Sequence, residues 1–339
     1  MAIQRKAILQ SALSFLVGFA ILFWVFRKNG ATIQETVADF RSVPVIWLVL
    51  TCVAFMFSNL SRAIRWNMLL HPLGYRPKLI NSFLAVMIGY LANMGIPRSG
   101  ELLRPATLSR YEKIPIEQSV GTTVTDRLMD FLSLFLIMAI GFFLKGRLLL
   151  DKLLELTSLN DIGNRVIPLV IIGVLGITGI WITIRWISNS THHLALRMKG
   201  MYLGLKDGLI SIIRIERPVW FTIHSLLIWI LYISMTYFCF KGFAPTAHIT
   251  WDQTIVIFIF GALGMIVPTP GGMGSYQFMI QTGLLIFGVA DTDGLAVANI
   301  IWFTISIICN LGFGLLALFL LPILNRSTVG TQRTEHKPT

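Results

Sequence analysis

Asn93-Met-Gly-Ile-Pro97-Arg98-Ser-Gly100-Glu101-Leu-Leu-Arg104 interrupts a long apolar stretch of this chain with a proline, glycines and charged side chains. A second interruption, Pro268-Thr-Pro270-Gly271-Gly272-Met-Gly274, breaks another apolar stretch. An ordinary spanning helix has no use for such sequences, because freed backbone groups and charges at membrane depth are tolerated only against protein or water. We therefore expect the two breaks to form the two halves of a translocation site.

The composition places the fold in lipid. Of 339 residues, 55% are hydrophobic and only 13% are charged, which is typical of an integral membrane protein. The first apolar stretch, residues 7–26, is too long for a signal peptide and ends at basic residues, so we interpret it as a retained span. The three cysteines and six histidines show no disulfide or metal-ligand spacing, and we expect neither a metal nor a cofactor.

Further apolar runs predict an all-α, polytopic membrane helix bundle with six or more spanning helices. They cover residues 43–60, 79–96, 128–144, 166–184, 219–240, 253–267, 273–290 and 295–321. Two of the predicted features are re-entrant or broken helical hairpins, at about residues 79–108 and 253–290. The whole forms one transmembrane domain, residues 1–324, followed by a polar cytoplasmic tail at 325–339.

The charge distribution predicts the orientation in the membrane. If the first hairpin opens to the cytoplasm and the second to the outside, both termini are cytoplasmic and most of the 28 Lys and Arg residues lie inside. Gly89 and Gly100 then recur as Gly261 and Gly272 at the same spacing, about half a chain later. Hairpins of opposite orientation at a constant offset predict a pseudo-inverted repeat, as in transporters with a midplane site. Chance recurrence in a glycine-rich membrane protein is the alternative.

Residues 192–216 predict an amphipathic helix lying on the cytoplasmic leaflet. Leu194, Met198, Met201 and Leu205 begin its apolar stripe, and Gly200, Gly204 and Gly208 form a face that a neighbouring helix can approach closely. An ordinary amphipathic connector is the alternative interpretation.

Basic side chains gather before and within the first break. Arg62 and Arg65 lie three residues apart, on one helix face near the inner end of a span. An arginine there is commonly a snorkelling anchor. Arg98, Glu101 and Arg104 repeat at the same spacing, so a helix that restarts after the break is expected to present Glu101 between two guanidinium groups. The alternative is a solvated helix.

Asp126, Arg127 and Asp130 precede and open the apolar run 128–144. The two carboxylates share a helix face, and Arg127 can reach Asp130. Capping of a helix start is the alternative, because carboxylates suit the positive end of the helix dipole. Guanidinium groups bind phosphate bidentately and stay charged when partly desolvated. The cluster therefore predicts a site for an anionic lipid head group.

These motifs resemble one family: flippase-like (UPF0104-type) membrane proteins related to the membrane region of lysylphosphatidylglycerol synthases. The resemblance rests on Arg62-x-x-Arg65-Trp66, on Asn93 to Arg104, on Asp126-Arg127 with Asp130, and on Pro270-Gly271-Gly272-x-Gly274. The family usually has glutamate at the positions of Asp126 and Gln277. The second change removes a charge from the outer break and puts in doubt any mechanism that needs a carboxylate there.

The resemblance implies movement of an anionic or modified phospholipid or polyprenyl phosphate between the leaflets of the cytoplasmic membrane. The expected partners are membrane lipids and a separate lipid-modifying synthase, with no nucleic acid. An ion-coupled transporter of a small soluble anion is the alternative, since the same breaks suit a free carboxylate or phosphate. An intramembrane lipid-modifying enzyme is less favoured, because no nucleophile and base pairing is recognisable, and we expect no enzyme activity.

Overall fold

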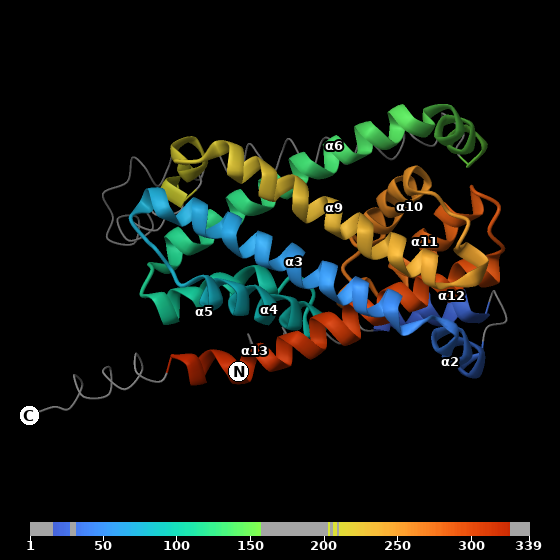
Figure 1. Ribbon diagram of the computed structural model, residues 1–339, viewed down its shortest axis with the longest axis horizontal. Coiled ribbons are helices and arrows are strands. Elements are labelled where there is room, and N and C mark those ends of the chain that lie inside the picture. The colour runs from blue at the N-terminus through green and yellow to red at the C-terminus, as the bar shows by residue number, and fades with distance from the viewer. Residues whose placement is uncertain (1–15, 28–31, 157–202, 204–205, 209, 326–339) are drawn as a thin grey trace, which may run out of the picture.

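The computed structural model describes residues 16–27, 32–156, 203, 206–208 and 210–325 (Figure 1). Its elements there are all helical. The principal ones are Leu16–Arg27, α2 (Ile33–Ser42), α3 (Val45–Leu70), α4 (Leu79–Gly95), α5 (Gly100–Glu112), α6 (Ile116–Leu156), α9 (Pro218–Gly242), α10 (Trp251–Gly264), α11 (Ser275–Leu285), α12 (Asp291–Trp302), the π-helical segment η5 (Phe303–Phe313) and α13 (Gly314–Leu324). The predicted span at 166–184 and most of the predicted interfacial helix lie outside the described residues.

Four helices in the described part are long and apolar enough to cross a membrane. They are Val45–Leu73, Ile116–Gly146, Pro218–Gly242 and Asp291–Leu324. At 1.5 Å per residue, α3 alone is about 39 Å long, more than the hydrocarbon thickness of about 30 Å. Leu16–Arg27, Leu79–Gly95 and Trp251–Gly264 are apolar but shorter. The membrane-protein assignment is confirmed, while the number of six or more spans stays a prediction.

The first break produces a helical hairpin. α4 ends at Gly95, residues 96–99 turn, and α5 folds back against α4. The glycines permit this close return: a Cβ on Gly100 would overlap the carbonyl oxygen of Gly89, and a Cβ on Gly89 would lie 3.1 Å from the Cβ of Arg104. The two arms are about 25 and 20 Å long, each shorter than the hydrocarbon layer.

The second break produces a similar hairpin from α10 and α11. A Cβ on Gly261 would lie 2.9 Å from the ring of Tyr276, and a Cβ on Gly264 would lie 2.7 Å from the carbonyl oxygen of Ser275. In the connection, Gly271, Gly272 and Gly274 all have positive φ, a conformation that side-chain-bearing residues rarely adopt. This explains why the sequence concentrates glycine there.

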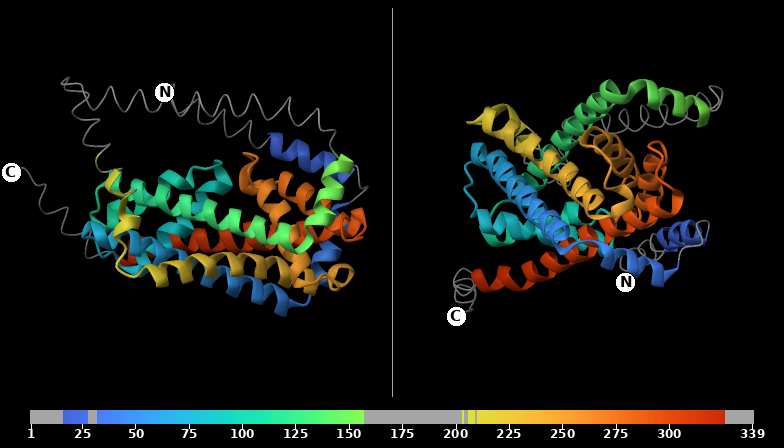
Figure 2. Two further views of the ribbon diagram at one scale, coloured as in Figure 1. Left: turned by 90° about the horizontal axis from the view of Figure 1, so that it is seen from above. Right: turned by 45° about the vertical axis from the view of Figure 1, so that its right-hand side comes forward.

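The two hairpins occupy opposite ends of the bundle and meet at their tips. Figures 1 and 2 show α4 and α5 at one end and α10 and α11 at the other, with α3, α6 and α9 running along the length. Between the tips, Arg98 Nη2 donates a hydrogen bond to the carbonyl oxygen of Ile266 at 3.2 Å. A Cβ on Gly271 would lie only 2.7 Å from the Met94 sulfur. Placed tip to tip, the two short hairpins thus together extend over the length that one spanning helix covers.

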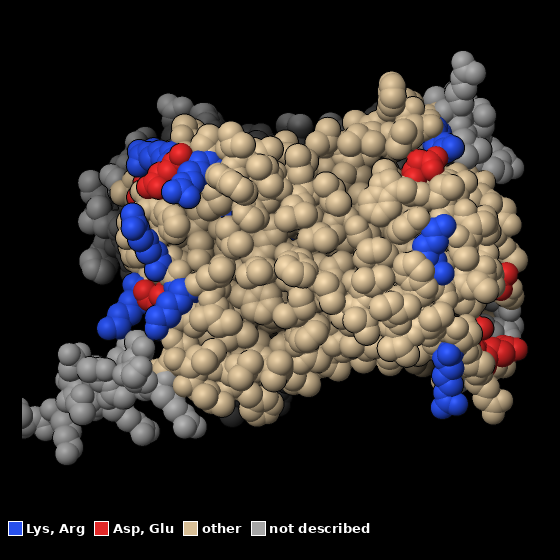
Figure 3. Space-filling view, in the orientation of Figure 1, with Lys and Arg blue, Asp and Glu red and all other residues tan. Residues whose placement is uncertain are grey.

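Charged residues on the face drawn in Figure 3 lie at the two ends of the molecule, with an uncharged belt between them. Most of the side chains of α6 that face outward along this belt are large and apolar, including Leu128, Phe131, Leu132 and Phe135. An apolar belt of this kind is what a lipid-facing surface requires. Of the predicted interfacial helix, Gly208 is described, and it packs directly against the backbone of Gly121 in α6, as its small size predicted.

We predict that Gly100→Ala destabilises the protein, by about 1–3 kcal/mol, because the new methyl group meets fixed backbone rather than a movable side chain. Gly95→Ala is the matched control: it lies at the end of α4 and its Cβ would meet nothing within 4 Å. Thermal unfolding in detergent compares the two. Equal melting temperatures for both variants would contradict the close return of α5 on α4.

Candidate functional site

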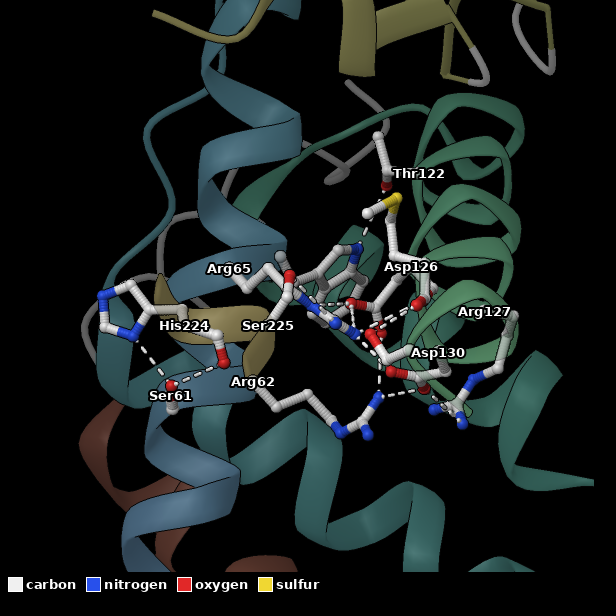
Figure 4. A network of polar contacts seen from close by, with 12 residues as sticks. Ser61, Arg62, Arg65, Thr122, Asp126, Arg127, Asp130, His224 and Ser225 are labelled. Carbon is white, nitrogen blue, oxygen red and sulfur yellow. Dashed lines mark hydrogen bonds and ion pairs between the residues drawn. The ribbon is translucent and has the colours of Figure 1, made fainter. Parts of the chain in front are cut away.

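Asp126 is the centre of a buried charge network between α3, α5 and α6 (Figure 4). Its Oδ1 accepts hydrogen bonds from Arg65 Nε at 2.8 Å and Arg65 Nη2 at 2.6 Å. Its Oδ2 lies 3.2 Å from Arg62 Nη1 and 2.9 Å from Arg104 Nη1. Asp126 and Arg65 are completely buried, and Arg62 and Arg104 are nearly so. One carboxylate therefore compensates guanidinium groups from two other helices.

Asp130, one turn later on α6, supplies the second carboxylate. It accepts from Arg62 Nη1 and from Arg65 Nη2, each at 2.7 Å. The spacing of Asp126 and Asp130 places both on the face of α6 that meets α3. Arg62 and Arg65 occupy one face of α3 for the same reason. The two aspartates of α6 thus pair with the two arginines of α3. The interpretation of Arg62 and Arg65 as snorkelling anchors is wrong, because both side chains are buried.

The network opens toward the surface at Arg127 and Glu101. Arg127 lies 3.2 Å from Asp130 through Nη1 and 3.0 Å from Glu101 through Nε. Their side chains are 35% and 38% exposed, against 13% for Asp130. The ion pair between Arg127 and Glu101 connects α5 to α6 at the rim, where screening by water weakens it. The rim is the accessible side of the network.

Of the buried arginines in the network, Arg104 leaves the most nitrogens without a hydrogen-bond partner: two, against one (Nε) for Arg62. It uses only Nη1, on Asp126, and its Nε and Nη2 are buried without a hydrogen-bond partner among the described residues. Its guanidinium group stacks on the ring of Trp66, 4.0 Å from the ring centroid, and Trp66 Nε1 donates to Thr122 at 3.1 Å. Stacking fixes the plane of the guanidinium group. The plane of this guanidinium group is therefore fixed, while two of its donors have no acceptor among the described residues.

Two tyrosines extend the network toward the hairpin tip. Arg62 Nη2 donates to the hydroxyl of Tyr232 on α9 at 3.2 Å, and that hydroxyl lies 2.9 Å from the hydroxyl of Tyr90 on α4. Tyr90 is three residues before Asn93, whose Oδ1 accepts from the Gly100 amide at 2.7 Å and holds the turn. Hydroxyl groups thus lead from the charges at one end toward the middle of the molecule.

The second break carries neutral polar groups only. Gln277 is buried, and its Oε1 accepts from the Gly274 amide at 2.8 Å. The indole of Trp302 donates to the carbonyl oxygen of Gly271 at 2.8 Å. Pro270 begins a short 3-10 turn, η4 (Pro270–Gly272). Gln277 therefore keeps the capping role at the start of α11 without the charge of a glutamate.

A cavity of about 440 Å³ lies beside this second break. Its lining comes from the helix Leu16–Arg27, α2, α11, α12 and η5: Leu22, Phe26, Thr36, Val37, Phe40, Arg41, Gln277, Asn299, Ile300, Trp302 and Phe303. The lining is mainly apolar. Its polar groups include Gln277 of α11, Asn299 of α12, and Thr36 and Arg41 of α2. A mainly apolar cavity thus adjoins the neutral half of the molecule.

Two details of the sequence interpretation need correction. Glu101 does not lie between Arg98 and Arg104, because α5 begins only at Gly100 and Arg98 belongs to the turn, with φ at 64°. Glu101 instead pairs with Arg127. Helix capping by Asp126 is also excluded, since α6 starts at Ile116, more than two turns earlier.

The predicted side chains otherwise divide into two groups. The structure brings together Arg62, Arg65, Glu101, Arg104, Asp126, Arg127 and Asp130, and separately Pro270, Gly271, Gly272, Gly274 and Gln277. Arg98 and Asn93 stay at the first tip. Sequence reasoning missed Tyr90 and Tyr232, which lie in apolar helices like many structural tyrosines. It named Trp66 only as part of the family motif, although its place one residue after Arg65 was a usable signal.

Comparison with known proteins adds the family. The family described as Lysylphosphatidylglycerol synthase TM region matches residues 11–326. The UPF0104 membrane protein MJ1595 of Methanocaldococcus jannaschii is 23% identical over 145 residues. That match covers 41% of this chain and 43% of the relative, so the aligned part spans less than half of either protein. No solved structure matches this chain.

We predict that Asp126→Asn lowers the free energy of unfolding by about 3–5 kcal/mol, because it leaves buried guanidinium groups without their shared counter-charge. Glu101→Gln is the matched control, since it also neutralises one network carboxylate but at the exposed rim, and it should cost about 1 kcal/mol or less. Unfolding in mixed detergent micelles measures both. A similar small loss in both variants would mean that the network is hydrated rather than buried.

Proposed function

This chain belongs to the lysylphosphatidylglycerol synthase TM region family, and we propose that it moves an anionic or modified phospholipid or polyprenyl phosphate between the two leaflets of the cytoplasmic membrane. The observation that carries the proposal is the pair of unpartnered donors on Arg104, Nε and Nη2, buried within a network of arginines. A buried donor without an acceptor costs about 1–3 kcal/mol. An incoming phosphate oxygen removes that cost.

The charge balance of the network supports an anionic ligand. Four guanidinium groups, of Arg62, Arg65, Arg104 and Arg127, face three carboxylates, of Glu101, Asp126 and Asp130. With all seven groups ionised the site carries one net positive charge, which one phosphate diester neutralises. The carboxylates hold the arginines in place when no ligand is bound, so the site stays formed between turnovers.

The internal symmetry of the fold supports alternating access. α3, α4, α5 and α6 correspond in order to α9, α10, α11 and α12, and their starts are shifted by nearly the same number of residues. At the offset that relates Gly89 to Gly261, Arg104 corresponds to Tyr276, and both glycines pack on these partners. The two hairpins extend from opposite ends of the bundle (Figure 1), so that their tips face each other. We infer an inverted repeat built around two re-entrant hairpins.

The two halves of the proposed path differ in charge. The same offset that carries Arg104 onto Tyr276 carries Asp126 onto Ala298, and Arg127 onto Asn299, so the outer half has no counterpart of the charge network. A head group is held by guanidinium groups on the inner side. On the outer side, the amides of Gln277 and Asn299 line the 440 Å³ cavity. We infer that the head group leaves through this cavity.

The soluble-anion transporter remains the second candidate, because free phosphate also satisfies Arg104. The outer cavity favours the lipid, since most of its lining is apolar and only a ligand with a hydrocarbon chain gains from that surface. We further propose that any modification of the lipid head group is made by a separate synthase. The reaction assigned to this chain is transport alone.

We predict that Arg104→Lys slows transbilayer movement of a fluorescent anionic phospholipid in reconstituted liposomes by about tenfold or more. Lysine keeps the charge and one contact to Asp126 but cannot present two oriented donors to a phosphate. Arg110→Lys is the control, because Arg110 is exposed in the last turn of α5 and outside the network. Equal rates for wild type and Arg104→Lys, with folded protein in both, would remove Arg104 from the path.

The same liposomes separate the two candidates. Uptake of radiolabelled inorganic phosphate or a small carboxylate, with no movement of the fluorescent lipid, would replace the lipid translocase by the soluble-anion transporter. Movement of the lipid without uptake supports the proposal.

A further inference from the structure

A second polar cavity lies outside the charge network. It has a volume of about 410 Å³ and is formed where α3 ends and α9 begins. Its lining among the described residues is Ile64 and Met68 of α3, His71 and Arg76 of the following turn, Ile215, Glu216 and Arg217 before α9, and Trp220 and His224 of α9. The proposed topology places this end of the bundle in the cytoplasm. None of these residues belongs to the network described above.

The lining of this cavity is apolar toward the membrane belt except for His224, and it is charged toward the end of the bundle. Ile64, Met68 and Trp220 belong to spanning helices, and Trp220 is 56% exposed, at the depth where amphipathic rings prefer to lie. Arg76 and Arg217 come from the segments outside the spans and are exposed. A molecule that fills this cavity therefore needs a hydrocarbon part and an anionic part next to it.

Glu216 restricts which lipid head groups suit this cavity. It lies in the same lining as the two arginines, one residue from Arg217. A carboxylate is an acceptor only, so it favours a ligand that carries a hydrogen-bond donor near its phosphate and disfavours one that is purely anionic. Glycerol or ethanolamine head groups carry such donors, and a choline head group has none.

The cavity and the charge network share a wall. Ser61 and Arg62 are successive on α3, and His224 and Ser225 are successive on α9. Ser61 Oγ lies 2.7 Å from His224 Nδ1, while Arg65 Nη1 donates to Ser225 Oγ at 3.4 Å. Figure 4 shows His224 and Ser61 on one side of α3 and the carboxylates of the network on the other. One layer of side chains therefore lies between the cavity and the charge network.

We propose that this cavity binds the head group of an anionic phospholipid of the inner leaflet, with a donor-bearing head group, as a resident lipid distinct from the one that is transported. Arg76 and Arg217 hold the phosphate, Glu216 accepts from the head-group hydroxyl, and Ile64, Met68 and Trp220 cover the start of the hydrocarbon chains. The proposal rests on the membrane orientation given above and not on transport itself.

Native mass spectrometry of the purified full chain, titrated with phosphatidylglycerol or phosphatidylcholine, tests this site. The Arg76→Gln, Arg217→Gln double variant should bind one phosphatidylglycerol fewer than the wild type, or bind it about tenfold more weakly, because the phosphate loses both of its charged hydrogen-bond donors. Arg110→Gln, which removes an exposed positive charge outside the cavity, should bind like the wild type. Phosphatidylcholine should occupy this site in none of the three.

Three results would overturn the assignment. Identical phosphatidylglycerol binding in wild type and double variant leaves the cavity without a role in binding, and an equal loss in Arg110→Gln indicates unspecific attraction. Displacement of the lipid by millimolar inorganic phosphate would identify a free anion as the ligand. A folded double variant is expected, since both side chains are exposed, and its melting temperature checks this. The transport defect of Arg104→Lys is a separate readout, so either proposal can fail alone.

Discussion

The structure depends on one ionised carboxylate, that of Asp126, which has no access to water and contacts three guanidinium groups. Moving an isolated ion of this kind from water to a medium of low dielectric costs several kcal/mol even after relaxation, and its neighbours must offset that cost. Arg62 and Arg65 come from α3 and Arg104 from α5, while Asp126 itself lies on α6. The carboxylate therefore fixes three helices relative to one another. The first hairpin is held in place by this contact as much as by its glycine packing.

The arginines of the network differ in whether all their donors hold the helices together or some remain for a ligand. Arg65 directs its donors to the two aspartates and Ser225, and Arg62 directs most of its donors to the aspartates and Tyr232, so both serve mainly to build the site. Arg104 is built into the same network but keeps two donors unused. Only residues that combine a fixed position with unused donors can bind a ligand without first giving up an existing contact. The network is preformed and nearly neutral, which limits the cost of burying its charges.

The sequence predicted the membrane class, the two hairpins and most of the charged residues, because charges and glycines in an apolar chain have few uses. It did not predict which arginine pairs with which carboxylate, since spacing along one helix says nothing about the face of another. Glu101 shows this limit: local spacing assigned it to Arg98 and Arg104, whereas tertiary packing gives it to Arg127. Tyr90 and Tyr232 were missed for the same reason, as a hydroxyl pair across two helices leaves no pattern in either one.

The position of a lipid phosphate relative to Arg104 decides whether the charge network binds the head group. Cryo-electron microscopy of the protein in nanodiscs that contain an anionic phospholipid can locate both groups. We expect a head-group phosphate within hydrogen-bond distance, about 3 Å, of Arg104 Nε or Nη2. If those nitrogens contact only water or protein while the lipid phosphates stay at the bilayer surface, the network holds the fold together but is not the binding site.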